Sequence, residues 1–171
     1  MPSIKINSTI GSEIVTVSDA KNFIRVDTSD DDTLIATIIE QARIVCENYI
    51  SSDIVSKNRT YYLEHANDRF EIPFSPIDSI SSVTVEGSAA TYTSYGANDE
   101  ILSLSKLAAK DIEITYITTG INNSLLKQAI LQLVSTLYDN RSDITVMQGI
   151  SFVEIPTDVK TLLSSMKNPF I

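Results

Sequence analysis

The chain has 171 residues and a net charge of −9, from 22 acidic and 13 basic side chains. This surplus of acids argues against a surface that wraps DNA, because such a surface needs clustered cations. No apolar run reaches the roughly 18 residues of a membrane span, and the first residues lack the charged-then-apolar pattern of a secretory signal. One cysteine excludes an internal disulfide, and one cysteine with one histidine provides too few ligands for an ordinary zinc site.

The N-terminal third predicts an arm followed by two helices. Residues 1–16 mix small polar residues with isolated isoleucines, so we expect an extended arm there. Ser18 is placed to cap a short helix over residues 19–25. The stretch 28–50 predicts a long amphipathic helix, because its apolar residues recur at a period near 3.6 and form a wide stripe. That stripe consists of Leu34, Ile35, Ile38, Ile39, Ala42, Val45, Cys46, Tyr49 and Ile50.

Three consecutive aspartates, residues 30–32, stand at the start of this long helix. A cation site is one interpretation, but the alternating acids, glycine and distal glutamate of an EF-hand loop are absent. The alternative explains all three: Ser29 or Asp30 caps the helix, and the following acids lie beside the positive end of its dipole. We favour the second interpretation. Glu40 and Glu47 are assigned to the polar face of the helix, and Cys46 is interpreted as a small hydrophobic residue on the stripe.

Near Ser51 the apolar pattern changes from period 3.6 to period 2, which predicts a small antiparallel sheet folded on itself. The clearest strand is 111–117, with Ile112, Ile114 and Tyr116 on one face. The turn at Gly87 predicts a hairpin between two of the strands, 79–86 and 91–95. The remaining strands are expected at 59–64, 70–72 and 101–105.

A second long helix is predicted at 125–140, capped by Ser124, and its similar stripe indicates that the two long helices pack on each other. Residues 141–155 then form a 15-residue connection rich in apolar side chains, which is unusual for a loop. Either it folds back as a small hairpin, or another subunit covers its apolar residues. A last short helix is expected from Pro156 to about Met166.

The expected fold is therefore α+β: a bundle of two long and two short helices with an inserted small antiparallel β-sheet or sandwich lobe. The whole chain, 1–171, is predicted to be a single domain. Its expected parts are an N-terminal arm (1–16), a helical body (17–56 and 124–166), an inserted β lobe (57–120) and a C-terminal tail (167–171).

No catalytic motif stands out, and we expect neither enzymatic activity nor a cofactor. The sequence lacks GxGxxG, GxxxxGK[ST] and GxSxG patterns. His65 lies in a polar turn without a recognisable nucleophile. Glu64 with Asp68 or Glu71 is a conceivable acid pair for glycoside cleavage, but surface acids are the favoured interpretation. Four tyrosines offer an alternative function, a stacking platform in a carbohydrate- or ligand-binding module of a virion or surface protein: Tyr61, Tyr62, Tyr92 and Tyr95.

Three stretches in order resemble the tailed-bacteriophage head-tail connector (adaptor, or head-completion) family. The first is VTVSDAKNFIRVDTSDDDTLIATIIEQARIVCENYI, the second is IPFSPIDSISSVTVEG, and the third is the late helix ending in Tyr138-Asp139-Asn140-Arg141. The residues at matching places in the first two stretches are Lys21, Arg25, Val26, Asp27, Asp30, Asp31, Asp32, Leu34, Ile35, Ala42, Tyr49, Pro73, Pro76, Ile77, Ile80, Ser82 and Val83.

This resemblance implies a non-enzymatic virion protein at the head-tail interface, made in the cytoplasm of a host bacterium. It implies a homo-oligomeric ring, usually a dodecamer, that binds beneath the portal, extends the DNA channel and docks the tail or a second ring protein during capsid assembly, genome packaging and ejection. DNA then passes without sequence-specific binding, and no membrane is involved. Acids expected to face the channel are Asp30, Asp31, Glu40 and Glu47. Residues expected at partner interfaces are Ile144, Val146, Met147, Ile150, Phe152, Phe170 and Ile171.

Overall fold

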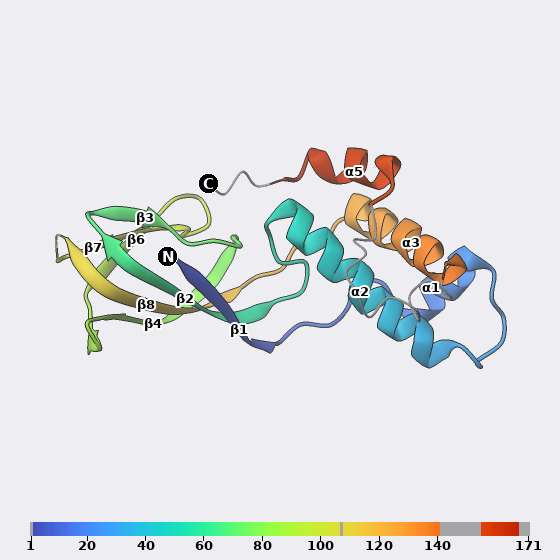
Figure 1. Ribbon diagram of the computed structural model, residues 1–171, viewed down its shortest axis with the longest axis horizontal. Helices are drawn as coiled ribbons and strands as arrows, with labels where there is room; N and C mark the ends of the chain where they lie inside the picture. The colour runs from blue at the N-terminus through green and yellow to red at the C-terminus, as the bar shows by residue number, and fades with distance from the viewer. Residues whose placement is uncertain (1, 107, 141–154, 168–171) are drawn as a thin grey trace. The chain divides into compact units, whose positions relative to one another are not determined.

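The computed structural model describes residues 2–106, 108–140 and 155–167, which divide into two compact units (Figure 1). Residues 2–12 and 51–121, apart from residue 107, form a β unit. Residues 13–50, 122–140 and 155–167 form a helical unit. Helices and antiparallel strands are thus segregated, which confirms the predicted α+β class.

The described part of the helical unit contains α1 (Val17–Ile24), α2 (Asp32–Ile50), α3 (Ser124–Asp139) and α5 (Thr157–Ser164). The long helices α2 and α3 pack on each other, as predicted, while α1 and α5 each contact both of them. The apolar stripes supply the core, because the same side chains that recur at helical spacing are the ones withdrawn from solvent. Buried residues of the two stripes are Ile35, Ile38, Ile39, Ala42, Cys46, Ile50, Leu126, Ala129, Ile130, Leu133, Val134 and Leu137.

The helix caps differ by one or two residues from those predicted. Thr16, not Ser18, caps α1 through a reciprocal capping box: its hydroxyl accepts from the Asp19 N–H at 3.1 Å, and its own N–H donates to the Asp19 carboxylate at 3.0 Å. Asn123, not Ser124, caps α3 by accepting from the Leu126 N–H at 2.9 Å. An asparagine side chain serves this position as well as serine does.

The β unit contains two antiparallel sheets. The five-stranded sheet has the order β1 (Ser3–Thr9), β2 (Lys57–Ala66), β8 (Ala109–Thr118), β4 (Ile77–Val85) and β5 (Ser88–Ala89). The three-stranded sheet has the order β3 (Arg69–Glu71), β7 (Ile101–Leu104) and β6 (Tyr92–Tyr95). One core joins the sheets, and it contains the predicted inward face of β8. Its buried residues are Tyr61, Ile72, Ile77, Val83, Val85, Leu102, Leu104, Ala109, Ile112, Ile114 and Tyr116.

Two features of the β unit differ from the local patterns. The predicted hairpin between 79–86 and 91–95 is wrong, because β4 turns into the two-residue strand β5 while β6 pairs with β7 in the other sheet. Within the segment expected to be an arm, Ser3–Thr9 forms the edge strand β1, paired with β2. Its pairing partners lie 48 to 59 residues away in the sequence, so no local pattern could indicate them.

Candidate functional site

The interface residues predicted from the apolar loop and tail lie outside the described residues. These are Ile144, Val146, Met147, Ile150, Phe152, Phe170 and Ile171. Apolar side chains that are exposed on the described helical unit include Phe23, Leu34, Ile44 and Leu125, each between 38 and 44% exposed. Leu34 comes from the wide stripe of α2, so one flank of that stripe is left uncovered by the helical unit itself.

The acids at the start of α2 make contacts within the helical unit. Asp31 accepts a hydrogen bond from the Tyr138 hydroxyl, which ties the start of α2 to the end of α3. Asp32 forms an ion pair with Lys21 of α1 at 2.7 Å. Asp30 is exposed. No group of three or more potential metal ligands occurs among the described residues. The contacts of Asp31 and Asp32 join the start of α2 to α3 and α1.

The buried Arg43 binds the remaining acids of α2 and one acid that precedes α1. Arg43 is 3% exposed, and its Nε donates to both carboxylate oxygens of Glu13, at 2.8 and 2.9 Å. Its Nη1 donates to Glu47 at 2.8 Å, and the exposed Glu40 lies 3.7 Å from Nη2. Burial alone lowers the pKa of Arg43, but the bonds to Glu13 and the charge of Glu47 outweigh it, so the pKa is raised.

The assignment of Glu47 to the polar face is therefore wrong, because its side chain is 3% exposed and is paired with Arg43, one helical turn away. A buried carboxylate cannot line a channel. Asp30, Asp31 and Glu40 remain exposed or half-buried on the helical unit. A signal for the buried pair exists in the sequence: position 43 falls four residues after Ile39 and three before Cys46, on the apolar stripe.

A second buried charge cluster lies in the β unit, around Asp53. The Asp53 carboxylate is fully buried and accepts four hydrogen bonds: from Lys57 Nζ at 2.9 Å, Arg59 Nε at 2.7 Å, Arg59 Nη2 at 2.6 Å and Thr118 Oγ1 at 2.8 Å. Burial alone raises the pKa of Asp53, but Arg59 and Lys57 outweigh it and the pKa is lowered. The cluster joins the segment before β2 to the last residue of β8.

Aromatic side chains complete the surroundings of this cluster. The Arg59 guanidinium stacks over the Phe74 ring, 3.8 Å from its centroid. The buried Tyr116 hydroxyl donates to the Pro73 carbonyl at 2.8 Å, and burial raises the pKa of that tyrosine. The segment that contains Pro73 and Phe74 is thus anchored to β2 and β8. The cluster is saturated with partners, which indicates a structural role in fixing this end of the sheet.

The tyrosines considered as a stacking platform do not share a surface. Tyr61 and Tyr62 are consecutive on β2, so their rings point to opposite faces. Tyr61 is 7% exposed and belongs to the core, whereas the Tyr62 hydroxyl bonds to Asp111 at 2.7 Å. Tyr92 packs against the core, and Tyr95 lies beneath the Arg69 guanidinium. This arrangement gives no support to a tyrosine platform.

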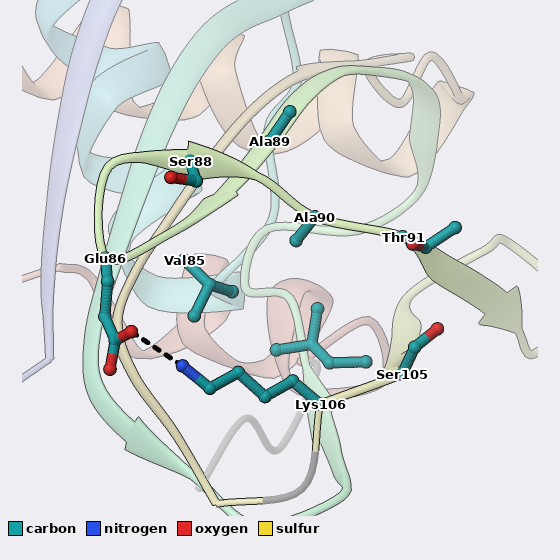
Figure 2. A pocket seen from close by; sticks show the side chains of 9 residues that line it. Val85, Glu86, Ser88, Ala89, Ala90, Thr91, Ser105 and Lys106 are labelled. Atoms are coloured by element: carbon teal, nitrogen blue, oxygen red, sulfur yellow. Dashed lines mark hydrogen bonds and ion pairs between the residues drawn. The ribbon is translucent and has the colours of Figure 1, made fainter.

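The acids considered for glycoside cleavage are exposed and separate: Glu64 lies on β2 and Glu71 on β3 of the other sheet. A general acid of this kind needs a carboxyl group held in an apolar site. The hollow in Figure 2, of about 340 Å³, lies beside the β4–β5 turn, and an exposed Lys106–Glu86 ion pair of 2.6 Å crosses it. Serine and threonine hydroxyls line it, but no histidine does so among the described residues.

Comparison with known families identifies the chain. Residues 14–101 match the model of the phage gp6-like head-tail connector family, a stretch that runs from just before α1 to the start of β7. The chain belongs to this family. The match begins after β1 and ends before β8, so it covers the helical N-terminal part and much of the β unit. No curated protein sequence matches the chain, and no helix in the described residues is long and apolar enough to span a membrane.

Three chains of solved structure share the fold almost end to end. One comes from the neck of an empty gene transfer agent (GTA) particle computed with C6 symmetry; it is 14% identical, with a TM-score of 0.72, over 99% of this chain and 97% of that one. Another comes from the neck of a native GTA particle computed with C12 symmetry, at 12% identity and a TM-score of 0.71 over the same shares. A third, from the virion of a native GTA particle, is 12% identical with a TM-score of 0.68, over 98% and 96%.

Proposed function

We propose that this chain is a non-enzymatic structural subunit of the virion neck, where it forms a ring beneath the portal. In this position the ring extends the DNA channel and docks the tail or a second ring protein. The observation that carries the proposal is family membership over residues 14–101 together with a fold shared with chains from particle necks. The protein needs no cofactor, is made in the host bacterial cytoplasm and ends in the virion at the head-tail interface.

Twelve subunits are the proposed number. One chain of the same fold comes from a neck computed with C12 symmetry and another from a neck computed with C6 symmetry, and both symmetries are compatible with a twelve-membered ring. A rotationally closed ring uses heterologous contacts, in which one side of a subunit binds a different side of its neighbour. The helical unit is proposed to form the ring body and the β unit a separate lobe; residues 51–56, expected in the helical body, belong to the β unit.

Surface acids are proposed to line the DNA channel. Asp30 and Glu40 are exposed on the helical unit, and Asp31 is half-buried near them in sequence. Acidic side chains repel the phosphate backbone, so DNA slides past them without sticking. Neutralising Asp30 and Glu40 together should leave ring assembly intact and slow DNA passage, measured as the rate of genome ejection from particles.

The apolar loop and tail are proposed to bind the portal or a neighbouring subunit. Their residues are Ile144, Val146, Met147, Ile150, Phe152, Phe170 and Ile171. Deleting residues 144–152 should weaken docking to the portal and preserve the helical signal in circular dichroism. Loss of that helical signal would show instead that the loop belongs to the core.

Negative-stain imaging of the purified chain, alone and mixed with the portal of the same virion, tests the ring. We expect closed rings, either free or seated on the portal. A chain that stays monomeric in both samples contradicts the proposed function. The Leu133→Ala variant, which weakens the buried core of α3 and leaves the surface unchanged, controls for effects of stability alone.

A further inference from the structure

Strand β1 has an open outer edge and carries exposed isoleucines. It pairs with β2 on one side, and no strand among the described residues pairs with its other side. Ile4 lies opposite Tyr61 and Ile6 opposite Arg59, both of which are buried. Directly opposite residues share a sheet face, so both isoleucines lie on the core side of the sheet. They are nevertheless 36 and 50% exposed.

Strand β4 offers a second open edge in the same sheet. It pairs with β8 along its length, but β5 covers only Thr84 and Val85. Two backbone hydrogen bonds to other segments lie on either side of the uncovered part of β4. The Ile77 N–H donates to the Asn98 carbonyl, and the Val83 carbonyl accepts from the Ala90 N–H. Residues 78–82 lie between these points, with no strand on their outer side among the described residues.

A small hollow lies beside this open edge. It has a volume of about 130 Å³ and is lined from β4, from Tyr92 and Ser94 of β6 and from Asp99. Ile80 and Tyr92 are half-buried side chains packed against the core, so they give the hollow an apolar wall, whereas Asp78, Ser79, Ser94 and Asp99 make the rest of its lining polar. An aliphatic side chain that enters from the open edge would cover both of them, which is the contact that Ile4 or Ile6 of another copy could make.

The directions of the two edge strands match a head-to-tail contact. Successive neighbours β1, β2, β8 and β4 are all antiparallel, so β1 and β4 of one copy run in opposite directions. Rotation about an axis nearly parallel to the strands preserves those directions. The β1 strand of one copy would therefore meet β4 of the next copy antiparallel, which continues the pattern of the sheet.

Charge also favours this pairing over a symmetric one. Lys5 is the only charged residue of β1, and Asp78 is the only charged residue of β4. Pairing β1 with β4 brings opposite charges to one interface, whereas pairing β1 with a second β1 brings two lysines together, which is unfavourable.

We propose that β1 of one subunit pairs with residues 78–82 of β4 in the next subunit, so that the five-stranded sheet continues from copy to copy around the ring. Ile4 or Ile6 covers the apolar wall that Ile80 and Tyr92 give the hollow, and Lys5 lies near Asp78. This inference rests on the ring assembly proposed above. It adds the surface that joins the copies, a contact made by edge strands of the β unit rather than by the helical unit.

The assembly of full-length variants tests this contact by mass photometry and negative stain, with the portal present if the wild-type chain requires it. Replacing both isoleucines, Ile4→Asp with Ile6→Asp, should raise the concentration needed for half-assembly at least tenfold. Ile10→Asp is the matched control, because Ile10 is 55% exposed but lies outside β1. That control variant should assemble like the wild type. Circular dichroism checks that each variant folds.

A charge swap keeps the test decisive if the double isoleucine variant fails to fold. Lys5→Glu and Asp78→Lys should each weaken assembly about two- to fivefold, and the two together should restore it. A double cysteine variant, Lys5→Cys with Asp78→Cys, should give a ladder of trimers and larger species with a bis-maleimide. The native Cys46 is buried, which raises its pKa to about 12 and keeps it unreactive.

The outcomes separate this inference from the proposed function. Rings that form normally in every edge variant overturn the strand pairing and leave the neck function standing. Lys5→Cys alone giving cross-linked dimers shows symmetric pairing of β1 with itself and also overturns the inference. A wild-type chain that never forms rings, even with the portal, removes both proposals.

Discussion

Replacing Asp53 tests how the β unit is held together. In Asp53→Asn the side chain keeps its shape but loses its charge, so the buried cations Lys57 and Arg59, which are 4 and 3% exposed, lose the carboxylate that they share. Removing one partner of a buried ion pair costs about 3–5 kcal/mol. Because one carboxylate here serves two cations, we expect the upper part of this range, about 4–5 kcal/mol. For a chain of this size that lowers the melting temperature by about 8–20 °C.

The measurement is urea unfolding followed by circular dichroism, with hydrogen exchange to locate the effect in β2 and β8. Asp68→Asn is the control, because Asp68 is exposed and accepts a single side-chain bond from Ser103 at 3.0 Å; its loss should stay within about 0.5 kcal/mol. A loss below about 1 kcal/mol for Asp53→Asn would refute the reasoning, because it would mean that the two cations do not depend on the Asp53 charge.

A triple variant distinguishes the contribution of the cluster's hydrogen bonds from the cost of burying charges that lack the Asp53 carboxylate. Replacing Asp53 with leucine and both Lys57 and Arg59 with methionine removes all three charges together. Such replacements are often neutral or stabilising, so the triple variant should be more stable than Asp53→Asn. If it is less stable, the hydrogen bonds of the cluster contribute more than the charge balance alone.

Three further predictions concern other positions. Thr16→Ala should lower stability by about 0.5–2 kcal/mol through loss of the α1 cap, whereas Ser18→Ala should change melting little; equal effects would contradict the cap assignment. Gly120→Ala should cost ~1–3 kcal/mol more than Gly87→Ala in urea unfolding. Both glycines have positive φ, +82° and +76°, but only at Gly120 would a Cβ lie 2.8 Å from a backbone oxygen, so equal losses would contradict the clash. Because the pKa of Asp53 is lowered in the folded state, its contribution to stability is present above about pH 4 and is lost as the pH falls through the folded pKa. The wild type should therefore lose more stability than Asp53→Asn between pH 4 and about pH 2. Parallel plots of unfolding free energy against pH for the two proteins would contradict this.

The sequence predicted the elements whose signal is local. The stripes of α2 and α3 and the alternation in β8 recur within a few residues, so the fold class and the α2–α3 contact followed from them. The edge strand β1 depends on a partner near residue 60, and the Asp53 cluster depends on Thr118, 65 positions away. In both cases, no residue nearby in the sequence indicates the distant partner.

The buried Arg43–Glu47 pair is an intermediate case. Its spacing of four residues is a local signal, and Arg43 falls on the apolar stripe. The prediction that Glu47 faces solvent rested on its polarity alone. The tertiary contact of Arg43 with Glu13 shows why both charges are buried together. The functional hypothesis came from the resemblance to the connector family, because the sequence carries no catalytic motif for residue-level reasoning to find.

The alternation of the chain between the two units also sets the order in which they can form during synthesis. The helix α2 ends at residue 50, but its packing partner α3 is complete only at residue 139, after the whole β unit has been made. At ribosomal rates of about 5–20 residues per second, the apolar stripe of α2 waits roughly 5–18 s for its partner. The nascent β unit can close around β1 in that interval. Chaperone dependence in the cell should therefore arise from the helical unit, and slowing translation after residue 121 should increase aggregation more than slowing it before residue 51.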